Sequence, residues 1–306
     1  MRGDWQPSAA QPVGQLNPAG YAGYGLTAGL IIAVSIVLST LGTHGRIALL
    51  RRPDRPRPSD LGTLRQRLRL LIADANYASL LACMLFFSVG AGIMTSLATY
   101  IQTYFWKLNA GHLAVLAGAT GVGVILGLVT VALLVRSDKK RTTISLYCAA
   151  VVAATGPVVL GLVGAIPRDI GALMPILFLQ QTLLIQCVFG AMIMGWSMIA
   201  DVADHMELKT GWRMEGLIFA ALVMINKAVS GVGVFLSGAI LTAIDFPEKA
   251  APADVPATTI DALALIYVSA VALMIAAAMG CLGFYGITRA AHAHTLRELG
   301  ARRPNR

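Results

Sequence analysis

One sixteen-residue stretch, from Asp201 to Gly216, combines ionisable side chains of both signs. It reads DVADHMELKTGWRMEG and contains four carboxylates, two cations and one histidine. On a helix, Asp201, Asp204 and His205 share one face, because residues spaced i, i+3 and i+4 are neighbours there. Together with Glu207 they could ligate a divalent metal, but we favour a network of salt bridges that joins two helix ends.

A short basic segment, residues 136–141 (RSDKKR), is the expected partner of these carboxylates. We predict that the two segments form one charged network, whose other members are Lys209, Arg213, Glu215, Arg136, Asp138, Lys139 and Arg141. The sequence shows no zinc-type spacing such as HExxH and no pairing of a nucleophile with a base. We therefore expect this charge chemistry to be structural or conformational, and we do not expect an enzyme.

Lys227 is the one charged residue that interrupts a long apolar stretch. It follows Glu215 by twelve residues, which places it about 18 Å into a helix. A buried ammonium group at that depth costs at least about 2.5–3.5 kcal/mol on insertion scales, so Lys227 should face a wet cavity or a carboxylate. Weaker candidates for contact with a polar solute are Asn226, Gln180, Gln181, Gln186, Tyr100 and Gln102.

The elements that must position these residues are membrane-spanning helices. Of the 306 residues, 57% are hydrophobic and 13% are charged, and the mean hydropathy is +0.71. A soluble domain has about 45–50% apolar and about 25% charged residues, so this composition excludes a water-exposed globule, a disordered chain and a small disulfide scaffold. Each of seven charge-poor runs exceeds the ~20 residues that cross a bilayer, and backbone pairing within the segment requires helices. The predicted spans are Gly20–Leu41, Ala75–Trp106, Leu108–Val135, Thr142–Pro167, Ile170–Ala200, Gly216–Ile244 and Ala262–Thr288.

The distribution of Lys and Arg predicts how these spans are oriented. With the amino terminus outside, nineteen cations lie on the inner side and four on the outer side, in accordance with the positive-inside rule. The net charge of +9 is then explained by the orientation of the spans in the membrane, and it does not indicate binding to nucleic acid. We expect a multi-pass protein of the bacterial plasma (inner) membrane, in contact with lipid, with its carboxy terminus in the cytoplasm.

The chain divides at a proline-rich basic segment. We predict a polar external leader (1–19), a first transmembrane helix (20–43), a cytoplasmic basic linker (44–73), a six-helix bundle (74–288) and a cytoplasmic basic tail (289–306). Leu61–Leu71, with arginines between leucines, is typical of an amphipathic helix at a membrane surface. In the tail, we expect His292 and His294 to be solvated among arginines. Glycines of the third and sixth spans should mark close helix contacts.

The motif D-x-x-D-H-x-E-x-x-T-G-x-R-x-E-G, from Asp201 to Gly216, closely resembles a signature of the glycoside–pentoside–hexuronide:cation symporters, the melibiose permease-like family of the major facilitator superfamily. Gly20–Arg46 is similar to that family's sixth helix, and Arg136–Arg141 to its loop between helices eight and nine. The resemblance extends to about Thr288. It implies one helix followed by a six-helix carboxy-terminal bundle, equivalent to family helices six to twelve.

The resemblance also implies a function. It predicts a secondary active transporter that moves a sugar or glycoside together with Na⁺ or H⁺ by alternating access, without a bound cofactor. Lys227 would match the family's cavity lysine in helix eleven, and the charged network would gate the inner side. The family's cavity tryptophan corresponds to Met192, so Trp196 is expected to pack. A partial or split chain that lacks the amino-terminal half is one interpretation, and a non-transporting remnant or interaction subunit that needs a partner chain is the other.

Overall fold

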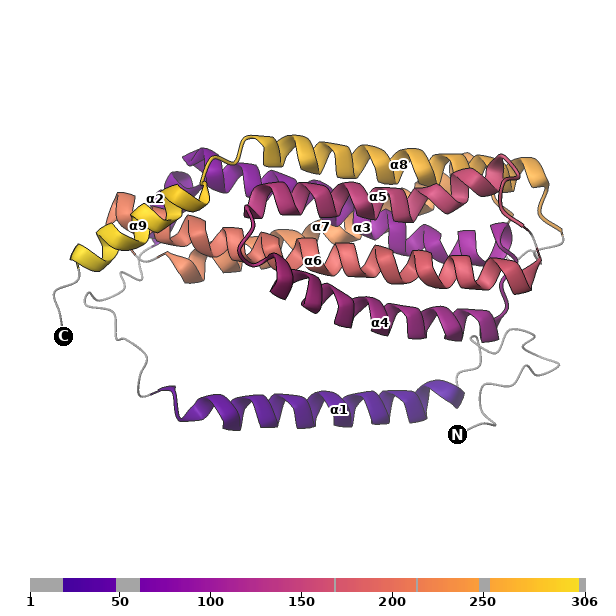
Figure 1. Ribbon diagram of the computed structural model, residues 1–306, viewed down its shortest axis with the longest axis horizontal. Coiled ribbons are helices and arrows are strands. Elements are labelled where there is room, and N and C mark those ends of the chain that lie inside the picture. The colour runs from indigo at the N-terminus through magenta and orange to yellow at the C-terminus, as the bar shows by residue number, and fades with distance from the viewer. Residues whose placement is uncertain (1–18, 48–60, 168, 213, 248–253, 303–306) are drawn as a thin grey trace. The chain divides into compact units, whose positions relative to one another are not determined.

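The computed structural model describes residues 19–47, 61–167, 169–212, 214–247 and 254–302 (Figure 1). Within these ranges the regular structure is entirely helical. Seven helices are long and apolar enough to cross a membrane, as the sequence predicts; they are α1 (Ala19–His44), α3 (Ala75–Tyr100, continued by η3), α4 (Ala110–Leu134), α5 (Lys139–Leu162), α6 (Ile170–Thr210), α7 (Glu215–Ala243) and α8 (Ala257–Gly283). The predicted all-α integral membrane fold is therefore confirmed.

The chain forms two compact units, residues 1–63 and 64–306. In the first unit, α1 carries apolar side chains over most of its length, and its stretch Gly25–His44 has a mean hydropathy of 2.0. The second unit contains the six remaining spans and two shorter helices, α2 (Leu61–Ala73, of which residues 64–73 belong here) and α9 (Arg289–Arg302).

The six spans of the second unit pack as an arc. Successive neighbours in it are α7, α3, α8, α5, α6 and α4, and only limited contacts of α6 with α3 and α7 close its open side. Helices α2 and α9 are both found at one end of this bundle in the view of Figure 1. We call this end the charged end; it also includes the connections from α4 to α5 and from α6 to α7.

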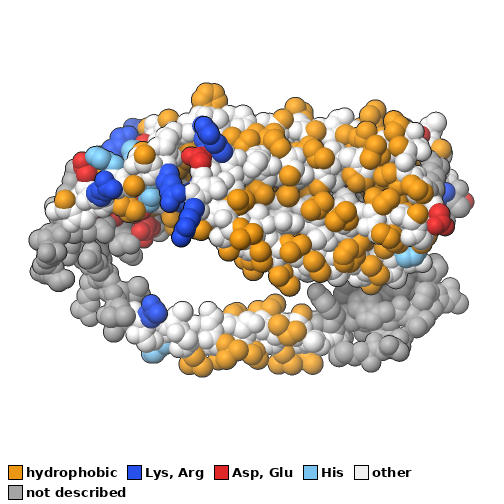
Figure 2. Space-filling model, in the orientation of Figure 1, with side chains coloured by type: hydrophobic (Ala, Val, Ile, Leu, Met, Phe, Trp, Pro, Cys, Tyr) orange, Lys and Arg blue, Asp and Glu red, His pale blue; other side chains and the backbone are white. Residues whose placement is uncertain are grey.

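The surface of the bundle separates by polarity along its length. Figure 2 shows orange apolar side chains over the bundle, whereas Lys, Arg, Asp, Glu and His side chains gather mainly at the charged end. The 41-residue helix α6 would extend about 60 Å, which is twice the ~30 Å hydrocarbon core, so its last turns project beyond the apolar region. These turns carry the motif that begins at Asp201.

Acidic and amide side chains begin four of the six spans of the bundle, namely α3, α4, α5 and α6. Asp74 accepts hydrogen bonds from two backbone N–H groups of α3, and Asp138 and Asp169 each accept one from a backbone N–H group in the first turn of α5 and α6. Asn109 and His112 form a capping box at the start of α4. At the other end of α6, Gly211 adopts a left-handed conformation with φ of 69°, which glycine reaches without strain and which turns the chain into α7.

Glycine at helix contacts is confirmed for only some of the predicted positions. A Cβ atom added at Gly123 would lie 2.8 Å from Ile185 Cβ and 2.8 Å from the Thr182 carbonyl oxygen, so α4 and α6 approach closely there. The same addition at Gly121 or Gly231 would meet no atom within 4 Å. Small residues therefore mark both close contacts and open helix faces, and composition alone does not separate the two.

Candidate solute pathway and charged end

The carboxylate of Asp201 is the centre of the first ionic cluster at the charged end. Lys139 Nζ donates to both of its oxygens at 2.7 Å, and His292 Nε2 lies 3.5 Å from Asp201 Oδ1 and 4.0 Å from Asp204 Oδ2. The Asp201 side chain is 9% exposed, so these contacts compensate a nearly buried charge. The cluster joins α6 to the start of α5 and to α9.

A second cluster surrounds Asp74, which sequence reasoning missed. Its side chain is 4% exposed, and Oδ2 lies 3.1 Å from Lys209 Nζ and 3.9 Å from His205 Nε2. Burial alone would raise the pKa of this carboxyl group, but hydrogen bonds from Lys209 and the Tyr77 N–H, with the charges of Lys209 and His205, lower it overall. An aspartate directly before an apolar helix is a capping signal that could have identified it.

The predicted network therefore consists of two separate clusters. In the first, Asp201 and Asp204 face His292, and in the second, His205 faces Asp74. The expectation that His292 is solvated is wrong, because its side chain is only 21% exposed and lies within 4.0 Å of the carboxylates of Asp201 and Asp204. His294 is 72% exposed, as expected for the tail.

The other predicted network residues have more local positions. The Asp138 side chain accepts from the backbone N–H of Arg141, and thereby starts α5. The backbone carbonyl of Arg136 accepts a hydrogen bond from the Arg289 guanidinium group. Glu207 and Glu215 bring negative charge close to Asp204. Arg213 lies outside the described residues. Among the described side chains, no group of three or more His, Cys, Asp and Glu is arranged to hold a metal ion.

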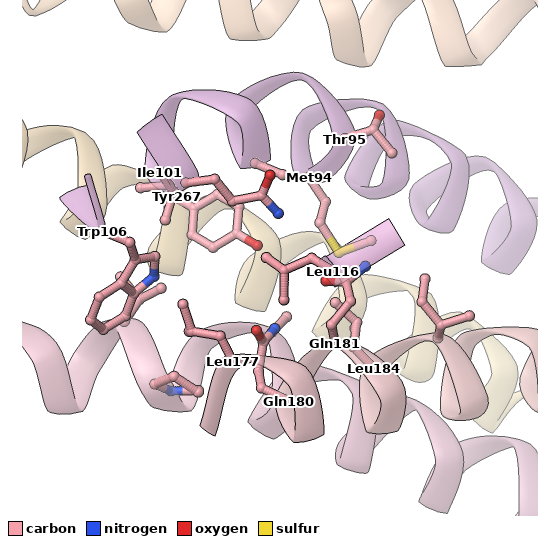
Figure 3. A pocket seen from close by; sticks show the side chains of 16 residues that line it. Met94, Thr95, Ile101, Trp106, Leu116, Leu177, Gln180, Gln181, Leu184 and Tyr267 are labelled. Atoms are coloured by element: carbon pink, nitrogen blue, oxygen red, sulfur yellow. The ribbon is translucent and has the colours of Figure 1, made fainter. Parts of the chain in front are cut away.

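Three of the four predicted glutamines, Gln102, Gln180 and Gln181, line a cavity of about 130 Å³ within the bundle. Figure 3 shows this cavity from close by. Its polar lining consists of Gln180, Gln181, Thr95, Gln102, Trp106 and Tyr267. We call it the amide cavity. Its walls come from α3, η3, α4, α5, α6 and α8, together with Trp106, which follows η3. The structure thus brings together polar side chains that are up to 172 positions apart in the sequence, namely Thr95 and Tyr267.

Gln186 and Tyr100 lie elsewhere. The Gln186 amide donates to Thr130 Oγ1 at 2.8 Å and links α6 to α4. Tyr100 packs against Tyr104, with ring centroids 6.0 Å apart, and contacts the edge of Phe246. Trp196 stacks on Phe219 at 5.8 Å, in accordance with its expected packing role. Sequence reasoning missed Trp106 and Tyr267, because an aromatic residue in an apolar run carries no signal of cavity contact.

Lys227 and Asn226 are exposed on α7. The buried residues Ile218, Leu222 and Gly233 share the face of α7 that packs against α3. At about 100° per residue, Lys227 lies on the opposite face of this helix. The side chain of Lys227 thus points away from the seam between α7 and α3.

These features define a multi-pass α-helical membrane protein, with a six-helix bundle, a polar cavity between its helices and an ionic network at one end. Residues 6–289 match the family model described as MFS/sugar transport protein. The chain belongs to this family.

Curated relatives match shorter regions. An uncharacterized symporter of Synechocystis is 36% identical over 118 residues, which is 38% of this chain and 22% of the relative. A candidate 2,3-dihydroxypropane-1-sulfonate exporter of Escherichia coli is 29% identical over 110 residues, and a candidate sulfoquinovose importer of the same organism is 28% identical over 110 residues. Each of these two matches covers 36% of this chain and 23% of the relative. The matched regions thus span less than a quarter of these relatives.

Proposed function

We propose that this chain supplies the carboxy-terminal bundle of a secondary active transporter, which moves a sugar or related hydroxylated solute together with Na⁺ or H⁺. A second bundle completes the solute pathway, as part of a longer polypeptide or as a second chain. The family match supports transport of this kind, and the relatives named as a symporter, an exporter and an importer agree with it. The observation that carries the proposal is the exposed lysine in the middle of α7.

The surroundings of Lys227 favour contact with another bundle over contact with lipid. Gly216, Gly231 and Gly238 lie on the same side of α7, and a Cβ added to any of them would meet no atom within 4 Å. Small residues let a second helix approach closely, whereas an ammonium group toward hydrocarbon is strongly unfavourable. A neighbouring bundle would fit closely against the small residues of this face, and its polar groups or water would surround the ammonium group of Lys227.

The charged end provides a conformational latch for such a carrier. In alternating access, one bundle rocks against the other around a solute site near the midplane. Lys139, Asp201 and His292 hold the ends of α5, α6 and α9 together, and Lys209 and Asp74 connect α6 to the start of α3. We propose that this end faces the cytoplasm and stabilises the outward-open state, so that Asp204→Asn slows uptake without abolishing solute binding.

Uptake of radiolabelled sugars into vesicles, with and without an imposed sodium or proton gradient, tests the proposed function. Vesicles are made from cells that express the chain in its natural genetic context, so that a second bundle encoded nearby is present. Lys227→Ala should abolish gradient-driven uptake. The matched control is Lys107→Asn, which removes a cation from an exposed position with φ of 54° and substitutes a residue that tolerates this conformation.

Equal loss of uptake in both variants, or full activity of Lys227→Ala, would contradict the assigned role of Lys227. Absence of gradient-driven uptake for every sugar tried would favour the alternative, a non-transporting remnant or an interaction subunit.

A further inference from the structure

Two connections of the bundle hold each other in place at the charged end, the one from α4 to α5 and the one from α8 to α9. Lys140, in the first turn of α5, donates from Nζ to the carbonyl oxygens of Gly283, at 2.6 Å, and Tyr285, at 2.8 Å. The guanidinium group of Arg289 donates in turn to the carbonyl oxygen of Arg136. Each cation thus satisfies free carbonyl groups at the carboxy-terminal end of a neighbouring helix, α8 or α4.

A further cation extends this group on the outer side of α5. Lys139 points toward α6, and Arg141 lies about 200° further round the helix. Exposed side chains continue from Arg141 along the same stripe of α5, namely Ser145, Cys148 and Val152. Substantial contacts join α5 to α6 and α8 and not to α7, so this stripe is separate from the face that carries Lys227.

We call Arg136, Lys140, Arg141 and Arg289 the cationic ridge. Within segments 135–141 and 284–289, all of which the structure describes, Asp138 is the only acidic residue, and it accepts a hydrogen bond from the backbone N–H of Arg141. None of the three arginines forms an ion pair with a carboxylate of the described residues. The ridge therefore carries an excess of positive charge, with guanidinium donors available to an external anion.

Large apolar side chains lie directly beside the ridge. Leu133 and Val135, at the end of α4, are 76% and 66% exposed. Phe284, which lies between the two carbonyl groups that Lys140 contacts, is 80% exposed. Figure 2 shows blue Lys and Arg side chains along the edge of the orange apolar surface. Because apolar groups leave water for hydrocarbon and long cations extend to its surface, the ridge lies where the hydrocarbon core meets the lipid headgroups.

We propose that the cationic ridge binds the phosphate headgroup of an anionic membrane lipid, such as phosphatidylglycerol, whose acyl chains lie along α5 and beside Phe284. Arginine donors match the oxygens of a phosphate in pairs, and lysine adds a point charge. The hydrogen bonds to helix ends already fix Lys140 and Arg289, so binding has to order few side chains. A zwitterionic lipid brings its own cation beside the phosphate and is bound more weakly. The ridge is independent of the proposed function, because the second unit of this chain supplies all of it.

Native mass spectrometry of the full chain, released from detergent micelles, tests this lipid site. The probes are phosphatidylglycerol and phosphatidylcholine with identical acyl chains. The first molecule of phosphatidylglycerol should bind at least about tenfold more tightly than phosphatidylcholine. Arg141→Gln should weaken phosphatidylglycerol binding by about fivefold, the usual effect of one cation near a membrane surface, and the double variant Arg136→Gln/Arg141→Gln should weaken it by about twentyfold.

Lys107→Asn is the matched control, because it also removes one exposed cation, but from the end of the bundle where α4 begins. It should leave phosphatidylglycerol binding unchanged, and circular dichroism establishes that each variant is folded. Equal binding of the two lipids, unchanged binding in the double variant, or an equal effect of Lys107→Asn would overturn the lipid site.

Fluorescence provides a second measurement that locates the lipid. The emission of Phe284→Trp, relative to that of the unaltered chain, should be quenched more strongly by phosphatidylglycerol brominated in its acyl chains than by brominated phosphatidylcholine. Adding Arg141→Gln should remove this difference. Equal quenching by the two lipids in Phe284→Trp would contradict a preference for anionic lipid beside the ridge.

Discussion

The seam between α7 and α3 depends on one glycine, and its replacement tests the position of the helix that carries Lys227. A Cβ added at Gly233 would lie 2.5 Å from the Val89 carbonyl oxygen, 2.8 Å from Gly92 Cα and 3.0 Å from the Ile93 backbone nitrogen. Ordinary contact begins at 3.4 Å, so the Cβ and the oxygen must separate by about 0.9 Å. Because all three neighbours are backbone atoms, no side-chain rotation can relieve the overlap.

The expected loss of stability in Gly233→Ala follows from overpacking at the contact between α7 and α3. Inserting a methyl group into a packed contact typically destabilises by about 1–3 kcal/mol. Alanine also gains about 1 kcal/mol over glycine in helix propensity, which partly offsets the loss. Gly231→Ala receives the same propensity gain on the open face of α7 and carries no overlap. We therefore expect Gly233→Ala to be about 1–3 kcal/mol less stable than Gly231→Ala.

Unfolding of the two variants in mixed micelles, by increasing the fraction of SDS and following helicity by circular dichroism, measures this difference. Lys227 lies six residues before Gly233, so a displaced α7 should also reduce uptake in the complete transporter. Equal stability of the two variants would refute the packing of α7 on α3 that places Lys227 on the outer face.

Three further predictions concern the charged end and the cavity. Asp74→Asn should lower the midpoint of thermal unfolding at pH 7, and this loss should shrink as the pH falls below about 4; the folded pKa of Asp74 is lowered, so its stabilisation is fully present above about pH 4 and is lost as the pH falls through the folded value. His292→Asn should release α9 from the end of α6 and speed its limited proteolysis, whereas equal cleavage of the exposed-site variant His294→Asn would argue against this contact. Gly161→Ala should shift tryptophan fluorescence, because the added Cβ would lie 2.8 Å from the Trp106 ring and displace the cavity indole; an unchanged spectrum would contradict the close approach.

Much of the fold follows from local features of the chain. Long charge-free runs predict the seven spans, since a bilayer accepts only segments whose backbone groups pair internally. The motif around Asp204 indicates the family because its charges occur at fixed spacing within sixteen residues. Hydropathy and short motifs are properties of neighbouring residues, and a single sequence displays them directly.

The lateral arrangement of the helices required the tertiary structure. Gly231 and Gly233 are two positions apart in one apolar run, yet only Gly233 touches backbone, because rotation of α7 about its axis decides which face meets α3. The ion pair between Asp74 and Lys209 spans 135 positions. The partners of a buried polar group are chosen by packing between distant segments, so they could not be inferred from the spacing of residues along the chain.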